Sequence, residues 1–300
     1  MTKLTSWIKA FRLRTLPLAI ASILMGSFLA IYADTYSWTI IILAIVTTLF
    51  LQILSNLAND YGDGIKGTDN ANRVGPKRTI QSGEITPAEM KIGIIVFILL
   101  SLISGVILII VSLGSNWAIG LLFLVIGILA IAAAIKYTVG NKAYGYSGMG
   151  DIMVFLFFGP VAVIGIYYLL TSNVPTTFFL PAFSMGLLST GVLNLNNMRD
   201  MKNDADSGKH TMALMLGYGN AKIYHFLLVT IALTLAIVFT MLNFSSIWQF
   251  IYLITYPVIV KDLITISRIQ DNYKLDPYLK KLAFSTLLFT LLFGMGLVLS

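Results

Sequence analysis

The sequence predicts an all-α membrane protein: one domain over residues 1–300 that forms a bundle of nine transmembrane helices. Hydrophobic residues make up 57% of the 300 positions and charged residues 11%, and the mean hydropathy is +0.86. A chain of this composition cannot enclose a water-soluble core within a polar surface. Apolar runs of the about 17 to 25 residues that cross a bilayer as helix recur along it. All of its basic residues lie at alternate ends of these runs.

Each apolar run is expected to form one membrane-spanning helix. The nine runs cover residues 16–33, 38–57, 92–113, 117–135, 152–170, 178–195, 223–242, 247–266 and 282–299. The first run follows four basic residues, but it is too long for a signal peptide and leads directly into a second span. Cysteine is absent, which excludes disulfides, thiolate metal sites and cysteine nucleophiles.

The charges predict the orientation of the bundle. All 20 Lys and Arg residues, Arg199 among them, fall in the N-terminal segment or in the second, fourth, sixth and eighth loops. The positive-inside rule then places the N-terminus and these loops in the cytoplasm, and the C-terminus outside the cell membrane. Because the basic residues record topology, the net charge of +7 does not indicate a nucleic-acid partner.

Two polar stretches, residues 56–69 and 194–209, directly follow apolar runs and carry clustered carboxylates. Within them, acidic residues lie three or four positions apart, so helices that continued through these stretches would carry each pair on one face. An asparagine lies four residues before an aspartate in each stretch and shares its face. The candidate metal ligands are Asn59, Asp60, Asp63, Asp69, Asn196, Asp200 and Asp204.

Carboxylates and amide carbonyls in this pattern indicate Mg²⁺, which binds hard oxygen ligands together with phosphate oxygens. Zinc fits poorly, because cysteine is absent and the two histidines have no partner at ligand spacing. Basic side chains interleaved with these acids indicate a diphosphate held between metal and cation. For two of them, Arg78 and Lys209, we favour this role over a purely topological one. The candidate diphosphate-binding residues are Arg73, Lys77, Arg78, Lys142 and Lys209.

A charged site at the mouth of an apolar bundle predicts a substrate with a diphosphate head and an apolar tail. Departure of diphosphate from an allylic carbon leaves a carbocation, and apolar walls would keep water away from it. Asp151, at the start of the fifth run, either contacts an aromatic acceptor or occupies a favourable helix N-terminus. Five aromatic residues could line the prenyl or aromatic pocket, but we expect them to face lipid: Phe155, Phe157, Phe158, Tyr167 and Tyr168.

These motifs resemble those of the UbiA superfamily, intramembrane aromatic prenyltransferases that form nine-helix bundles. The first motif is seen in Asn59-Asp60-Tyr61-Gly62-Asp63 followed by Asp69, and the second in Asp200-x-x-x-Asp204 followed by Gly208-Lys209-His210-Thr211. Within the superfamily, residues 10–18, 63–69, 73–78, 148–151 and 157–160 resemble the 1,4-dihydroxy-2-naphthoate polyprenyltransferases. That resemblance implies Mg²⁺-dependent transfer of a polyprenyl group from its diphosphate to the naphthoate, with loss of CO₂, giving demethylmenaquinone.

The resemblance also implies roles for individual residues. It makes Asp63, Asp200, Asp204, Arg78 and Lys209 the catalytic residues, and Tyr137 and Asp151 candidate contacts to the aromatic acceptor. The chain departs from the pattern in two places. The third acid of the first motif would fall at Gly67 and is found at Asp69, and a Tyr-x-x-x-Lys element is seen only as Tyr137 with Lys142, one residue longer.

Three alternatives remain open at this stage. The acceptor could be another aromatic acid, such as 4-hydroxybenzoate. A CDP-alcohol phosphotransferase would share the Asp-x-x-Asp-Gly element at residues 60–64, but half of the acids here lie over a hundred residues away. A cation-coupled transporter would carry its carboxylates near the middle of its spans, whereas these lie at the ends.

Overall fold

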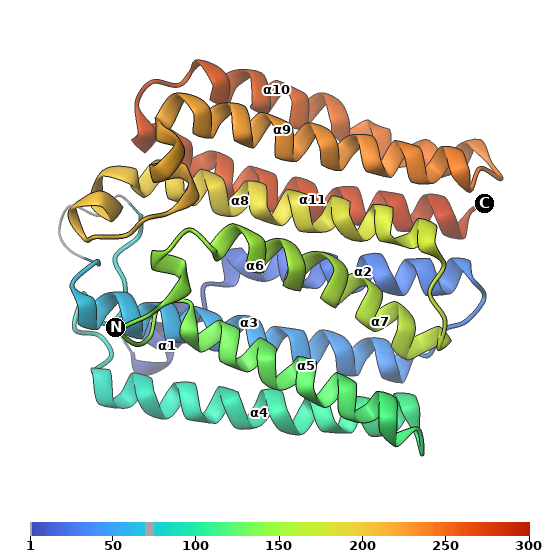
Figure 1. Ribbon diagram of the computed structural model, residues 1–300, viewed down its shortest axis with the longest axis horizontal. Coiled ribbons are helices and arrows are strands. Elements are labelled where there is room, and N and C mark those ends of the chain that lie inside the picture. Colours follow the sequence, from blue (N-terminus) through green and yellow to red (C-terminus); the bar gives the residue numbers. More distant parts are fainter. Residues whose placement is uncertain (1, 70–74) are drawn as a thin grey trace.

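The structure is a computed structural model that describes residues 2–69 and 75–300. Its long helices run side by side along the length of the molecule (Figure 1), and the described residues contain no strand. In this part of the chain nine helical segments are long and apolar enough to cross a membrane. The predicted all-α bundle of nine spans is therefore confirmed. The spans are Lys3–Tyr32, Trp38–Lys66, Pro87–Leu113, Trp117–Lys136, Gly150–Thr171, Thr176–Asp206, Met212–Leu242, Ile247–Arg268 and Asn272–Val298.

Several spans are made of more than one helix. The α-helices are α1 (Lys3–Ala10), α2 (Leu16–Tyr32), α3 (Trp38–Lys66), α4 (Pro87–Leu113), α5 (Trp117–Lys136), α6 (Gly150–Leu156), α7 (Ala162–Thr171), α8 (Phe179–Asp206), α9 (Met212–Leu242), α10 (Tyr256–Arg268) and α11 (Asp276–Val298). Short 3₁₀ or π segments join or extend them: η1 (Leu13–Thr15), η2 (Tyr144–Tyr146), η3 (Phe157–Val161), η4 (Thr176–Phe178), η5 (Ile247–Thr255) and η6 (Asn272–Leu275).

Helices α3 and α8 continue beyond the apolar runs that predict them. Each carries its polar stretch as helix and ends close to a glycine in the left-handed region, Gly67 at φ +73° and Gly208 at φ +70°. Such a glycine reverses the chain at low cost and satisfies the last carbonyls of the helix. As a result, the acidic residues stand on two rigid helix ends.

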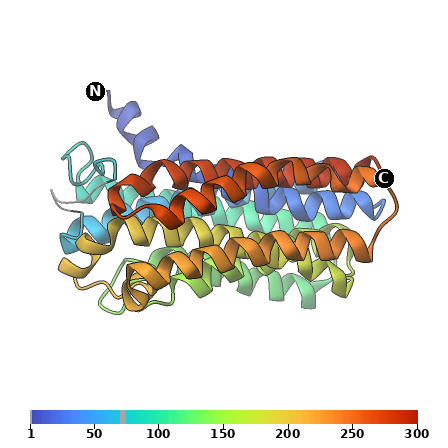
Figure 2. The ribbon, with the colours of Figure 1, turned by 90° about the horizontal axis from the view of Figure 1, so that it is seen from above.

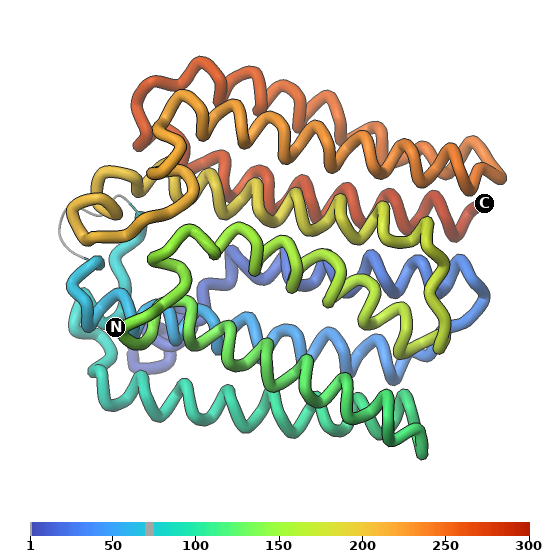
Figure 3. Tube along the Cα trace, in the orientation of Figure 1, coloured from blue at the N-terminus to red at the C-terminus, as the bar shows by residue number. Residues whose placement is uncertain are grey.

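Both polar stretches lie at one end of the bundle. Figure 1 and Figure 2 place the N-terminal helix, the loops that follow α3, α5 and α8, and the α10–α11 connection at this end, with the C-terminus at the other. In Figure 3 the end of α3 lies next to the α8–α9 turn, in agreement with the hydrogen bond from Asn203 to the carbonyl oxygen of Thr68. The arrangement agrees with the alternation of basic loops along the sequence.

The fifth span is interrupted by the π-helical segment η3. Pro160 has no N–H for the helix ladder, and a Cβ on Gly159 would lie 2.7 Å from the carbonyl oxygen of Ala182 on α8. The distorted turn therefore lets α8 approach closely, and bulges of this kind occur often at functional sites. Phe157 and Phe158 line an internal cavity here, so the expectation that they face lipid is wrong.

The same correction applies further along this span. Tyr168 lines the cavity. Tyr167 is buried in the main core, where the centroids of its ring and the Phe178 ring lie 4.9 Å apart in an edge-to-face arrangement. The core lies where α2, α7, α8, α9 and α11 meet, whereas α4 and α5 expose most of their apolar side chains. In a bilayer such helices associate through close packing, which favours small residues at the contacts.

A glycine on α2 allows a close approach to the backbone of α7. A Cβ at Gly26 would lie 2.2 Å from the carbonyl oxygen of Val163 on α7. We expect Gly26→Ala to lower the stability of the detergent-solubilised protein by about 1–3 kcal/mol, because α7 must move away. Gly219→Ala on α9 is the matched control, since nothing lies within 4 Å of its Cβ. Thermal unfolding midpoints compare the two, and equal midpoints would contradict the packing described.

Candidate active site

One internal cavity of about 900 Å³ connects the polar end of the bundle with its apolar interior. Side chains from both polar stretches line it together, although the stretches are far apart in the sequence. The structure thus brings most of the predicted site into one place. The predicted residues that line it are Asn59, Asp63, Asp69, Arg78, Tyr137, Asn196, Asp200, Asp204 and Lys209.

Lys209 links the two polar stretches directly. Its Nζ lies 3.4 Å from Oδ2 of Asp63 on α3 and 3.7 Å from Oδ1 of Asp204 on α8. Burial alone would lower the pKa of Lys209, but the two carboxylates outweigh it and the pKa is raised. The ammonium therefore stays charged between two acids. The left-handed Gly208 reverses the chain after α8. As a result, the Lys209 N–H donates a hydrogen bond to the carbonyl oxygen of Asp204 at 2.9 Å, and the Lys209 side chain lies near both acids.

The left-handed Gly67 explains the displaced third acid of the first motif. After this residue, the N–H groups of Thr68 and Asp69 both turn back to the carbonyl oxygen of Asp63, at 3.0 and 3.4 Å. This reversal buries Asp69 in the cavity wall, with Arg78 Nε 4.0 Å from its Oδ2. An acid at position 67 itself would require a side chain in the left-handed region.

Tyr146, in η2 between α5 and α6, joins these groups, and the sequence analysis does not include it. Its hydroxyl lies 2.8 Å from Oδ1 of Asp63 and 2.6 Å from Oγ1 of Thr68. The ammonium groups of Lys66 and Lys209 lie 4.0 and 5.0 Å from the centre of its ring, where the π face attracts cations. Burial and the Asp63 charge raise the pKa of Tyr146, so the hydroxyl remains a donor.

A second link between the stretches runs through Asn203, which the sequence analysis also misses. Its Nδ2 donates to the carbonyl oxygen of Thr68 at 2.9 Å. Its Oδ1 is buried and accepts no hydrogen bond from the described residues. Asn203 lies seven positions after Asn196 and three after Asp200, a helical spacing that could have revealed it.

Arg199 is the third residue that the sequence analysis leaves out of the site, since it is counted only among the topological charges. Its side chain is fully buried. Nε and Nη2 donate to the two carboxylate oxygens of Asp200 at 2.8 and 2.6 Å, and Nη2 also donates to Asn196 at 2.9 Å. Nη1 donates to Asp276 at the start of α11. No spacing rule predicts this contact with a distant helix.

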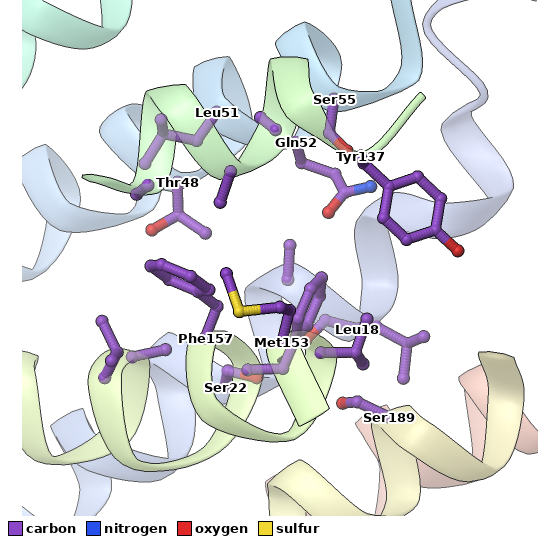
Figure 4. Close-up of a pocket in the computed structure, with 18 of the residues that line it drawn as sticks. Leu18, Ser22, Thr48, Leu51, Gln52, Ser55, Tyr137, Met153, Phe157 and Ser189 are labelled. Carbon is purple, nitrogen blue, oxygen red and sulfur yellow. Dashed lines mark hydrogen bonds between the residues drawn. The ribbon is translucent and has the colours of Figure 1, made fainter. Parts of the chain in front are cut away.

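Beyond the polar end the cavity becomes largely apolar (Figure 4). Leu18, Leu51, Met153 and Phe157 converge on it from several helices, with a few polar groups such as Gln52 among them. A cavity of this depth can enclose a hydrocarbon tail while its head remains at the acidic end. The lining pattern, mostly apolar with a few convergent polar groups, is typical of a small-molecule site.

Asp60 and Lys77, which are also among the predicted residues, do not line the cavity. Asp60 is buried, but its Oδ2 accepts from the N–H and the hydroxyl of Thr79 at 3.2 and 2.6 Å. It lines a separate pocket of about 280 Å³ together with the exposed Lys77. Although Asp60 and Asp63 are three residues apart on one continuous helix, only Asp63 lines the cavity, and Asp60 holds the loop that carries Arg78.

Two further predicted residues are not part of the cavity wall. Lys142 is exposed and does not line the cavity. Asp151 is buried and does not line the cavity, so of the two candidate acceptor contacts only Tyr137 reaches it. Arg73 lies outside the described residues.

The residues present fit a hard divalent cation. Among the described residues no three His, Cys, Asp or Glu side chains are grouped closely enough to form a metal site by themselves. The cavity is nevertheless lined by Asp63, Asp69, Asp200 and Asp204, and by Asn203, whose buried amide oxygen accepts no hydrogen bond from the described residues. Such a set of oxygen donors suits Mg²⁺, which completes its shell with phosphate and water.

Comparison with known proteins gives full-length relatives. The chain is 41% identical over 300 residues to the 1,4-dihydroxy-2-naphthoate octaprenyltransferase of Escherichia coli, covering 100% of this chain and 97% of the relative. It is 33% identical to the protein of the same name from Mycobacterium tuberculosis, covering 97% and 96%.

Solved structures share the fold at low sequence identity. A UbiA homolog from Archaeoglobus fulgidus bound to DMAPP and Mg²⁺ superposes with a TM-score of 0.60 at 16% identity, covering 95% of this chain and 98% of that one. An apo UbiA homolog from Aeropyrum pernix gives 0.66 at 13%, covering 89% and 96%. The model of the UbiA prenyltransferase family matches residues 19–288. The chain therefore belongs to the UbiA prenyltransferase family.

Proposed function

We propose that this protein transfers a polyprenyl group from polyprenyl diphosphate to 1,4-dihydroxy-2-naphthoate in a Mg²⁺-dependent reaction, with loss of the carboxylate as CO₂. The observation that carries the proposal is the meeting of Asp63 and Asp204 across Lys209 at the mouth of a deep apolar cavity. The names of the full-length relatives support this acceptor over 4-hydroxybenzoate. Membership in the family speaks against the phosphotransferase and transporter alternatives.

The acidic end of the cavity would hold the donor's diphosphate. Asp63, Asp69, Asp200 and Asp204, with the amides Asn59, Asn196 and Asn203, are the groups that would hold Mg²⁺ there. Mg²⁺ would supply charge neutralisation to the departing diphosphate. A solved relative of the same fold contains Mg²⁺ together with a prenyl diphosphate, DMAPP.

Basic side chains would bind the remaining diphosphate oxygens. Arg78 and Lys209 line the cavity next to the carboxylates. Guanidinium and ammonium groups form strong charge-assisted hydrogen bonds to phosphate oxygens. When diphosphate binds, Lys209 would exchange part of its contact with Asp63 and Asp204 for a contact with the phosphate. Its positive charge would then offset the repulsion between those acids and the incoming anion.

The apolar part of the cavity would bind the tail and protect the reactive carbon. Cleavage of the allylic C–O bond leaves a cation that water would capture, and the walls formed by Leu18, Leu51, Met153 and Phe157 exclude water from it (Figure 4). The electron-rich naphthoate ring forms the new C–C bond, and the carboxylate leaves as CO₂. Since neither step is an oxidation, the immediate product is the hydroquinone form of demethylmenaquinone.

The reaction would take place at the cytoplasmic face of the cell membrane. The N-terminus and the loops that hold the basic residues lie at the same end of the bundle as the acidic site (Figure 1). The positive-inside rule assigns that end to the cytoplasm and the C-terminus to the opposite side. This orientation gives the site direct access to a soluble aromatic acid, while the prenyl donor enters from the bilayer.

Asp63→Asn and Asp204→Asn should each reduce prenyl transfer by at least about 100-fold, the upper end of what loss of an outer-shell partner costs a metal site. Asp206→Asn is the matched control, because this acid is exposed at the end of α8 and does not line the cavity. Product formation in membranes containing equal amounts of each variant provides the measurement. Full activity in either of the first two variants would exclude the metal role of that residue.

Removal of divalent metal should abolish the reaction reversibly. Membranes treated with EDTA and then offered labelled polyprenyl diphosphate and 1,4-dihydroxy-2-naphthoate should form no product, and added Mg²⁺ should restore it, because the carboxylates alone repel the diphosphate. A parallel reaction with 4-hydroxybenzoate tests the acceptor. Turnover that persists in EDTA, or a preference for 4-hydroxybenzoate, would overturn the corresponding part of the proposal.

Arg78→Ala should raise the KM for the diphosphate donor by about tenfold or more, the cost of one charge-assisted contact, and change the KM for the acceptor much less. Lys77→Ala is the matched control, since this neighbouring residue is exposed and does not line the cavity. Steady-state kinetics with each substrate varied in turn separates the two constants. Equal increases for donor and acceptor would contradict a diphosphate-specific role.

A further inference from the structure

We propose that Arg199 is a positioning residue that holds Asp200, Asn196 and Asp276 toward the cavity, so that the last span contributes a carboxylate to the metal–diphosphate site. The proposal rests on the proposed function for the identity of the ligand. It adds Arg199 and Asp276, which belong to neither acidic pattern in the sequence. It also assigns α11 a part in the site.

The first support is the way in which the Arg199 charge is buried. The side chain has no exposed surface and donates four hydrogen bonds: two to Asp200, one to Asn196 and one to Asp276. Asp200 is its sequence neighbour, so the guanidinium must curl back along α8 to reach both carboxylate oxygens. The planar fork of arginine matches a carboxylate in this two-point manner, which lysine cannot do.

The second support is the position of the accepting oxygens. Asn196, Asp200 and Asp276 all line the cavity, whereas Arg199 does not. The guanidinium therefore stands behind the wall and contacts these groups from the rear. A carboxylate offers about four lone-pair sites, so two N–H bonds from Arg199 do not by themselves exhaust the capacity of Asp200. Groups fixed from behind in this way are typical of metal sites, where outer partners orient the ligands.

The third support is the anchoring of α11 to α8. Asp276 is the first residue of α11, and Asn272 in the preceding turn donates to the carbonyl oxygen of Met198 at 3.0 Å. The Asp276 side chain remains 40% exposed, unlike the arginine that it contacts. Lys280, one helical turn further on, also lines the cavity. The start of α11 thus offers a carboxylate to a bound metal ion and an ammonium group to a bound diphosphate.

A purely structural salt bridge does not account for this arrangement. Buried ion pairs seldom stabilise a fold more than well-packed apolar residues of the same size. A structural pair would also not require all three of its acceptors to lie on the surface of one cavity. The geometry instead fits a cation that sets the direction of ligands in advance, so that less ordering is needed when the metal and diphosphate bind.

The test measures metal binding separately from catalysis. Purified protein in detergent is titrated with Mn²⁺ in the presence of inorganic pyrophosphate, and the free ion is followed by electron paramagnetic resonance. Arg199→Met should weaken Mn²⁺ binding by about tenfold or more, Arg199→Lys should restore part of the loss, and Asp276→Asn should weaken binding severalfold. Asp262→Asn is the matched control, because Asp262 pairs with Lys281 outside the cavity.

Kinetics should show the same order of variants in the KM for the diphosphate donor, with the KM for the acceptor unchanged. Wild-type Mn²⁺ affinity in both Arg199→Lys and Asp276→Asn would overturn the proposal, even if Arg199→Met failed to fold, and so would an equal loss in Asp262→Asn. If the variants ranked as predicted in Mn²⁺ affinity but the wild-type protein did not prenylate the naphthoate, the proposed function would fail while the role of Arg199 stood.

Discussion

The contact of Lys209 with Asp63 and Asp204 is the interaction on which the rest of the site depends. Two carboxylates brought together at the wall of an apolar cavity repel each other, and each attraction to an ammonium at about 4 Å is worth about 4 kcal/mol at an effective dielectric constant near 20. Lys209 lies within this range of both acids. Lys209 therefore allows the ends of α3 and α8 to lie close together without a bound metal. Its ammonium supplies the positive charge that Mg²⁺ would bring to these acids in the proposed reaction.

The two helix ends that meet at Lys209 are built in the same way. In each, a span continues as helix through an acidic stretch and then reverses at a left-handed glycine, Gly67 or Gly208. The reversal returns the following residues to the carbonyl oxygen of an aspartate in the last turns of the helix, Asp63 or Asp204. The two polar stretches therefore share their backbone geometry as well as their clustered carboxylates.

Much of this arrangement could be predicted from the sequence, because its causes are local. Apolar length predicts the nine spans, and helical spacing places Asp63 with Asn59 and Asp200 with Asp204. Helical spacing does not show that Asp60 differs from Asp63, because its carboxylate accepts a hydrogen bond from Thr79 and does not line the cavity. Tyr146 and Arg199 could not be found in this way, since their roles arise from contacts with other elements. Local pattern thus predicts which helices carry the chemistry, and tertiary contacts decide which side chains reach it.

The positions of Lys209 and Arg199 explain how several acids coexist at one end of the cavity. Lys209 stands in front of the carboxylates and can yield its contacts to a diphosphate, whereas Arg199 is fully buried behind Asp200 and cannot leave without stranding a charge. One cation is therefore exchangeable and the other fixed. A site divided in this way would keep its ligands in place through the proposed reaction cycle, while its net charge would change as the diphosphate and its metal bind and leave.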